Sequence, residues 1–266
     1  MSKSNSVSIL LPVFNCEPYI EKAINSLINS TFKNFEIVFI NDGSTDNTLQ
    51  LVKKINDKRI KIYNKGNSGL IETLNFGLQK CKYHIVMRMD GDDIIDKYKI
   101  EKQLSYLVKS ESILVGTQGK LIDPDGIKKR DINLPINHDE IVKSLLRFSP
   151  GLIHPSVMFY KDALIKIGGY NENFKHAEDY EMYLRLIKVG KLSNLNEKLI
   201  YLRKHDTNVS SLNSKEQIKN SIISREIFLD SVTSKIDRKL YLIYKEKTEK
   251  KNIYKLFVKV QTTIVY

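Results

Sequence analysis

Hydrophobic and polar positions alternate regularly through the first ninety or so residues. Apolar runs wide enough for one buried strand occur at residues 7–13, 35–40, 60–63 and 84–89. Between them, apolar residues recur at helical spacing, as at Ile20, Ala23, Ile24 and Leu27. Alternating strands and helices are typical of βαβ units. The pattern predicts an α/β fold with a mostly parallel central sheet and helices on both faces.

The second half of the chain has longer helical patterns. We expect helices at 97–110 and 136–148, one that ends at Gly168-Gly169, and one that begins at Glu178. Strands are expected at 113–116, 157–160 and 199–205, with a hairpin turn at 123–126. Residues 1–211 are predicted to form one domain and residues 212–266 a helical, basic extension.

Polar side chains follow each of the first four expected strands. In open sheets with parallel strands, ligands bind beyond the carboxyl ends of the strands. The residues at these positions are Phe14 and Asn15, then Asp42, then Asn67, and finally Asp90 and Asp92. Because they come from separate strands, they predict a shared binding crevice. A single Asp42 would otherwise be read as a turn or cap residue.

The fourth strand runs into Asp90-Gly91-Asp92-Asp93. Carboxylates packed this closely repel one another unless a cation lies between them. Mg²⁺ and Mn²⁺ prefer oxygen ligands, and they need few protein carboxylates when they also bind phosphate. The sequence has no GxGxxG and no P-loop motif. These residues therefore predict a metal–diphosphate site, with an acidic turn as the alternative.

A second acidic pair, Glu178-Asp179, begins an expected helix. The helix dipole alone would favour carboxylates there. Near a metal crevice, one of them could instead accept a proton from an attacking hydroxyl. His205 follows the last expected strand, where it is either a structural histidine or a further metal ligand.

Composition narrows the cellular setting. The chain has 266 residues, 41% of them hydrophobic, and a formal net charge of +12, which favours anionic partners. Its two cysteines, Cys16 and Cys81, have no metal-type spacing, so a reducing compartment is expected. No signal peptide or membrane span is apparent. We expect a cytoplasmic protein, with attachment to the inner face of the cytoplasmic membrane as an extension of that prediction.

The tail at residues 235–259 mixes basic residues with aromatic and aliphatic ones. Such a segment can lie on an anionic membrane surface. The alternative is a pair of helices that fold back on the domain or form a homodimer contact.

Several motifs in order resemble family 2 of the inverting glycosyltransferases, which have the GT-A fold. The resemblance covers about residues 7–211. It is carried by residues 9–15 (ILLPVFN), 41–46 (NDGSTD), 67–69 (NSG), 75–77 (NFG), 88–93 (RMDGDD), 168–170 (GGY) and 178–180 (EDY) with Arg185.

The resemblance implies a role for each matching position. Asp42 would bind the nucleobase, typically uracil, in a pocket shaped by Pro12, Phe14 and Glu17. The ribose and phosphates would be held by Asn67, Arg88 and Asp90. Asp92 and His205 would ligate Mn²⁺ or Mg²⁺. Asp179 would be the general base, Glu178 would bind substrate hydroxyls, and His154 would lie on the acceptor side.

The implied reaction moves a hexose or N-acetylhexosamine from a nucleotide sugar, expected to be UDP-linked, to a sugar hydroxyl of a growing glycan. A lipid-linked O-antigen, capsule or lipopolysaccharide would be the acceptor. Two positions depart from the family pattern. Leu74 stands where many members have Arg, so Arg88 is expected to compensate at the phosphates, and Asn41 replaces a frequent Asp.

Two other function classes remain as alternatives. A sugar nucleotidyltransferase would need a glycine-rich, basic loop after the first strand, and residues 12–17 do not provide one. A non-enzymatic nucleic-acid-binding protein would fit the charge, but no DNA- or RNA-binding motif accompanies it. We therefore expect no nucleic-acid partner.

Overall fold

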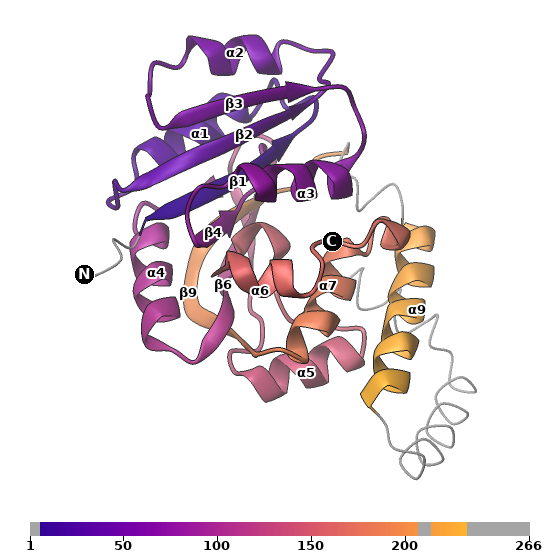
Figure 1. Ribbon diagram of the computed structural model, residues 1–266. Helices are drawn as coiled ribbons and strands as arrows, with labels where there is room; N and C mark the ends of the chain where they lie inside the picture. Colours follow the sequence, from indigo (N-terminus) through magenta and orange to yellow (C-terminus); the bar gives the residue numbers. More distant parts are fainter. Residues whose placement is uncertain (1–5, 207–213, 233–266) are drawn as a thin grey trace.

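The computed structural model describes residues 6–206 and 214–232. Within them, a central sheet has the strand order β3-β2-β1-β4-β8-β6-β9-β5, and β7 pairs with β6 (Figure 1). The strands are β1 (Val7–Val13), β2 (Phe35–Asp42), β3 (Ile60–Lys65), β4 (Ile85–Arg88), β5 (Ile94–Ile95), β6 (Ser112–Ile122), β7 (Lys128–Ile132), β8 (Met158–Tyr160) and β9 (Lys191–Arg203).

Helices lie on both faces of this sheet, as the sequence pattern predicts. They are α1 (Ile20–Ile28), α2 (Thr48–Lys54), α3 (Leu70–Lys80), α4 (Lys99–Lys109), α5 (His138–Leu146), α6 (Lys161–Lys166), α7 (Glu178–Ile187) and α9 (Ser214–Val232), with short 3₁₀ turns η1 (His154–Ser156) and η2 (Glu172–Phe174). Alternate residues of β1 enter different cores. Ile9 and Leu11 pack with α1 and α4, whereas Leu10 packs with α3 and with residues of α5 and α7.

The prediction of a mostly parallel sheet is wrong, because the sheet is mixed. The pairs β1–β2, β2–β3, β1–β4 and β6–β9 are parallel, whereas β4–β8, β6–β8, β6–β7 and β5–β9 are antiparallel. A parallel neighbour needs a long crossover, usually a helix. The βαβ units supply such crossovers up to β4. Beyond it, β8 enters beside β4 in the opposite direction.

The first four predicted strands and their helices are confirmed, with boundaries shifted by a few residues. Two later strands are longer than predicted. β6 continues to Ile122 because its second half pairs with β9 on one side and with β7 on the other. β9 begins at Lys191, so the predicted strand at 199–205 is only its second half, and His205 lies two residues beyond its end.

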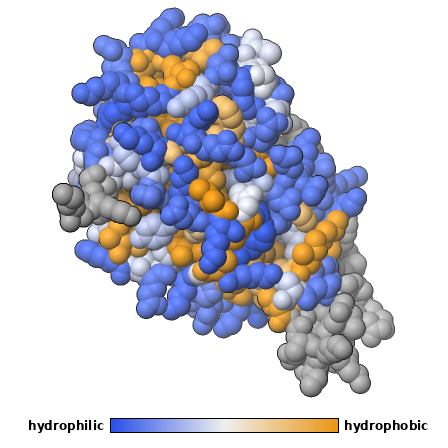
Figure 2. All heavy atoms as spheres, viewed as in Figure 1, coloured by the Kyte–Doolittle hydropathy of each residue, from blue (hydrophilic) through white to orange (hydrophobic). Residues whose placement is uncertain are grey.

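α9 packs against α7 and η2 at the side of the domain (Figure 1). Phe228 of α9 is 9% exposed and joins the core that contains Leu10 and Met182. Figure 2 shows a mainly hydrophilic face with a hydrophobic patch along α9, where Ile223 and Ile227 are exposed. The division at residue 211 stays a prediction, and the basic tail at 235–259 lies outside the described residues. Among the described helices, none combines the length and hydropathy needed to cross a bilayer.

Candidate active site

The end of β4 carries the predicted acidic cluster. Asp90, Asp92 and Asp93 each present a carboxylate oxygen, and these atoms lie within 4.8 Å of one another. Arg88, which is 2% exposed, holds Asp90 with both terminal nitrogens, at 2.7 Å from Oδ2 and 2.5 Å from Oδ1. Such a two-point contact fixes the orientation of the carboxylate. The Arg88 guanidinium, which is the main cation beside this cluster, therefore pairs with Asp90.

The segment that follows β9 brings His205 to the cluster. His205 Nε2 lies 2.9 Å from Asp92 Oδ2. The imidazole stacks on Tyr19 at 5.0 Å between ring centroids, and the Arg203 guanidinium lies 4.9 Å from the centroid of the same tyrosine. Arg203 also donates from its backbone N to Asp93 Oδ1 at 2.9 Å. The structure thus brings together the two residues predicted as metal ligands, which are 113 positions apart in sequence.

Crowding and burial shift the acidity of this cluster. Burial raises the pKa of Asp90 to about 6; the Arg88 charge works against this rise, and Asp92 and Asp179 add to it. Burial, together with the neighbouring charges of Asp92 and Asp90, raises the pKa of Asp93 well above its usual range. Carboxylates that resist ionisation in this way are stabilised as anions by a cation. With the His205 imidazole, this donor set suits Mn²⁺ or Mg²⁺.

The second acidic pair begins α7. Burial, followed by the charge of Asp179, raises the pKa of Glu178 to about 7. Burial also raises the pKa of Asp179, whose Oδ1 accepts a hydrogen bond from Tyr180 N at 2.7 Å. The Arg88 charge lowers the pKa of both carboxylates. Both carboxylates in turn raise the pKa of Tyr170, which the Arg88 charge also lowers. The candidate base and the candidate metal ligands therefore share one electrostatic environment, with Arg88 and Asp90 common to both.

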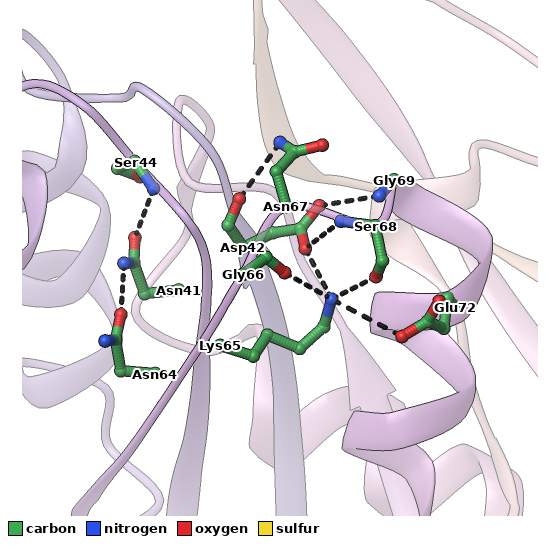
Figure 3. A network of polar contacts seen from close by, with 10 residues as sticks. All are labelled: Asn41, Asp42, Ser44, Asn64, Lys65, Gly66, Asn67, Ser68, Gly69 and Glu72. Atoms are coloured by element: carbon green, nitrogen blue, oxygen red, sulfur yellow. Dashed lines mark hydrogen bonds and ion pairs between the residues drawn. The ribbon is translucent and has the colours of Figure 1, made fainter.

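The end of β2 forms a different kind of site, drawn in Figure 3. Asp42, 4% exposed, accepts hydrogen bonds from Ser68 N and Gly69 N, just before α3, at 3.0 Å each. Lys65 Nζ lies 2.5 Å from Asp42 Oδ1, and Asn67 Nδ2 donates to the backbone O of Asp42. Burial works to raise the pKa of Asp42, but the hydrogen bonds from Lys65 and Ser68 outweigh it and lower the value.

A tight loop supports this cradle. Gly43 has φ of 71°, and a Cβ there would lie 2.6 Å from the backbone N of Asn67. Only glycine permits both the left-handed conformation and the close approach. The loop after β2 therefore lies directly against the loop after β3.

The remaining predicted donor residues surround the end of β1. Pro12 is buried within β1, while Phe14 follows it with 48% of its surface exposed. Glu17 accepts hydrogen bonds from Asn47 N and Nδ2 at 2.9 Å each, so its carboxylate fixes the start of α2. Asn67 is exposed. The roles of these residues in donor binding stay predictions.

His154 lies deeper than expected for a residue that contacts an acceptor. It is 8% exposed, and its Nε2 is 3.0 Å from Tyr170 OH. Burial, with the nearby Arg88 charge, lowers its pKa well below the usual range, so the ring is neutral. The acceptor role stays a prediction, and the structure packs the ring against Tyr170 and Tyr183.

A cavity of about 600 Å³ lies beside His205. Its lining comes from the loop after β1, the β6–β7 hairpin and the segment after β9, and includes Tyr19, Lys129 and Lys204. Asp42, Asp90 and Asp179 do not line it within the described part of the chain. Of the two candidate metal ligands, His205 lines the cavity, and Asp92 is not among its described lining residues.

Sequence reasoning missed three residues that shape the site: Lys65, Tyr19 and Arg203. Lys65 could have been found, because it pairs with Asp42 in the parallel register of β2 and β3. The predicted strands at 35–40 and 60–63 both end two residues early, so they leave out Asp42 and Lys65. Tyr19 and Arg203 meet because the end of β9 returns to the loop after β1, which no local pattern encodes.

Comparisons with known proteins identify the family of this chain. A model of glycosyl transferase family 2 matches residues 8–168. The O-antigen biosynthesis glycosyltransferase WbnJ of Escherichia coli is 33% identical over 208 residues, which cover 75% of this chain and 80% of WbnJ.

Solved structures show the same fold. S. aureus TarS 1-349 in complex with UDP-GlcNAc has a TM-score of 0.65 at 24% identity, covering 76% of this chain and 60% of that one. Mannosyltransferase PcManGT from Pyrobaculum calidifontis, in complex with GDP-Man and Mn²⁺, has a TM-score of 0.60 at 12% identity, covering 96% and 84%. This confirms a GT-A-like α/β fold, and the chain belongs to glycosyl transferase family 2.

Proposed function

We propose that this glycosyltransferase is metal-dependent and inverting, and that it moves a hexose or N-acetylhexosamine from a UDP-sugar to a hydroxyl of a growing surface glycan. The similarity to WbnJ supports a role in polysaccharide synthesis. The UDP-GlcNAc complex of TarS supports a UDP-linked donor. Family membership gives no support to the nucleotidyltransferase and nucleic-acid-binding alternatives.

One observation carries this proposal. Burial raises the pKa of Asp90, and the charges of Asp92 and of Asp179, which lies at the start of α7, both add to this rise. A displacement at the anomeric carbon needs a leaving diphosphate on one face and a base on the opposite face. An acidic centre that joins the candidate metal ligands to the candidate base meets that need.

Each residue has a defined task in the proposed reaction. Asp179 accepts the proton of the acceptor hydroxyl as that oxygen bonds to the anomeric carbon. Its raised pKa makes it a stronger base than an ordinary aspartate. Arg88 fixes Asp90 against the donor, and Glu178 binds substrate hydroxyls. Asp92 and His205 would hold Mn²⁺ or Mg²⁺, which, when bound, acts as a Lewis acid that stabilises negative charge on the departing diphosphate.

The acceptor and its location are also part of the proposal. A lipid-linked glycan at the inner face of the cytoplasmic membrane would place the acceptor near the basic residues at 235–259. The full chain should then bind anionic vesicles, and a chain ending at residue 234 should bind them less well. Equal binding by both would remove the membrane contact from the proposal, and a change of mass in solution between the two chains would indicate a homodimer contact instead.

The central experiment is a donor panel with a sugar acceptor, run with Mn²⁺, with Mg²⁺ and with EDTA. We expect transfer from a UDP-sugar only with metal, and a product whose anomeric configuration, read by NMR, is opposite to that of the donor. Retention of configuration would exclude a single displacement. Equal transfer in EDTA would exclude the metal site.

A further inference from the structure

Asp42 and Lys65 form a buried ion pair whose lysine has no task in the proposed function. The two residues are direct neighbours in the parallel register of β2 and β3, and their side chains are 6% and 15% exposed. Lysine is seldom this buried unless it serves a partner. Lys65 Nζ also contacts Gly66 O at 3.1 Å and the hydroxyl of Ser68, so its position is fixed from several sides (Figure 3).

The hydrogen-bond capacity of Asp42 is almost used up. A carboxylate offers four acceptor positions, two on each oxygen. Oδ1 accepts from Lys65 Nζ at 2.5 Å and from Ser68 N at 3.0 Å, and Oδ2 accepts from Gly69 N at 3.0 Å. One position therefore remains for a ligand, and it belongs to Oδ2.

Thr73 is the other polar group beside this carboxylate. Its buried hydroxyl helps to lower the pKa of Asp42 through a side-chain hydrogen bond. Because a hydroxyl can rotate to another partner, the fourth position, on Oδ2, is the one that a ligand can take. Since Asp42 stays ionised, it can only accept hydrogen bonds, and a base must offer it an N–H group.

Bases differ in how many N–H groups they offer on one edge. Uracil has a single N3–H between two carbonyl oxygens. Guanine presents N1–H and its 2-amino group side by side, and a carboxylate pairs with both only when both oxygens are open. The fold does not decide between them, because structures of this fold hold UDP-GlcNAc in one case and GDP-Man in another.

We infer that Lys65 selects the nucleobase by occupying Oδ1 of Asp42, which leaves a carboxylate that can pair with one N–H of a base and not with two. This inference rests on the proposed function, in which Asp42 binds the base. Lys65 acts through Asp42 and is a positioning residue. It favours uracil and disfavours guanine, whose 2-amino group would be buried without an acceptor.

Inosine diphosphate tests the inference on the unaltered protein. It has the purine size and the N1–H of guanine but lacks the 2-amino group. We expect calorimetry with Mn²⁺ to show that UDP binds, and that IDP binds about tenfold more tightly than GDP, because an unpaired buried donor is costly. Equal affinity for GDP and IDP, or tighter binding of GDP, overturns the inference while UDP binding keeps the proposed function intact. If no nucleoside diphosphate binds, both fail.

Lys65→Met provides the matching test on the protein, with Lys61→Met as control. Lys61 lies on the same strand with an exposed side chain. In Lys65→Met the opened Oδ1 should reduce the ratio of IDP to GDP affinity to about one, or allow GDP to bind where wild type binds neither purine. A purely structural defect would weaken both nucleotides and leave their ratio unchanged, which would overturn the inference. Lys61→Met should keep the wild-type ratio.

Discussion

Buried carboxylates lie in two regions of the candidate site, and their surroundings shift their pKa values in opposite directions. At the end of β2, Asp42 has a lysine and two backbone N–H groups, and its pKa is lowered. At the end of β4 and the start of α7, acidic residues outnumber Arg88, and the pKa values of Asp90 and Glu178 are raised to about 6 and about 7.

We propose that the two regions have different tasks, ligand binding at the end of β2 and catalysis at the acidic centre. A carboxylate whose hydrogen-bond partners are already in place can bind a ligand without rearrangement. Ionisation is unfavourable in a crowded set of carboxylates. A bound cation stabilises the ionised form, and the raised pKa makes a carboxylate a stronger base. Removing the lysine charge from the first region should therefore destabilise the protein, and removing a carboxylate charge from the second should stabilise it.

Asp179→Asn should have the largest effect. The asparagine keeps the size of the side chain but cannot accept the proton, so transfer should fall by about 10²–10⁴-fold. Calorimetry should show unchanged affinity for UDP, because the change lies outside the β2 region. Transfer near the wild-type rate with normal donor binding would show that Asp179 is not the base.

The wild-type rate should also depend on pH in a way that reports this base. Because burial raises the pKa of Asp179, kcat/KM should fall with decreasing pH at values above those of an ordinary aspartate. A profile of kcat/KM against pH under saturating metal measures this. A fall only at the ordinary aspartate pKa would place the reacting base elsewhere.

Lys65→Met should lower the free energy of unfolding by about 1–3 kcal/mol, measured in urea. It leaves Asp42 buried without its cation, and the partial exposure of Lys65 keeps the cost below that of a fully buried pair. Lys61→Met, on an exposed face of β3, should change stability by less than about 0.5 kcal/mol. An equal effect of both variants would contradict the paired character of this region.

Glu178→Gln should have the opposite sign. Because the folded-state pKa is raised from 4.5 to about 7, the folded protein binds this proton more tightly, and wild type loses stability as pH rises between these values. At pH 8 without metal, the variant should be about 1–3 kcal/mol more stable than wild type, and the gap should close below about pH 4.5.

Glu140→Gln is the matched control for this change. Glu140 also lies in the first turn of a helix, α5, but it is exposed. Its removal should be neutral or slightly destabilising, since only a helix-dipole contact is lost. A gain in stability from Glu140→Gln as large as that from Glu178→Gln would mean that crowding at the centre is not the cause.

The sequence predicts one part of this contrast better than the other. The first four strands are visible as apolar runs, and the ends of these strands place Asp42, Asp90 and Asp92, because a parallel sheet aligns its carboxyl ends. The mixed half of the sheet is hidden. β8 is a short strand whose direction depends on its neighbours, and β9 carries polar residues such as Asn194 that are buried only through long-range hydrogen bonds.

The same limit applies to individual charges. The motif around Asp90 gives its position but not its pKa, which depends on Arg88, on burial and on Asp179 from another helix. The Lys65 partner of Asp42 was within reach of the sequence, because it needs only the register of adjacent strands. Contacts between neighbouring strands are thus predictable where the strand ends are placed correctly, whereas contacts through the returning chain, such as Tyr19 with His205, are not.

Divalent metal should give the smallest effect and also the most direct test of the crowded region. A ligand that binds only the folded state raises the free energy of unfolding by about 1.4 kcal/mol at ten times its Kd. Thermal unfolding should therefore shift upward with Mn²⁺ or Mg²⁺ and return to its starting value with EDTA. Asp92→Asn should remove the shift, because Asp92 belongs to the carboxylate cluster and contacts His205. Lys65→Met should keep it, since that residue serves only the paired region. A shift that survives Asp92→Asn, or one that disappears with Lys65→Met, would mean that the two regions do not divide recognition from chemistry.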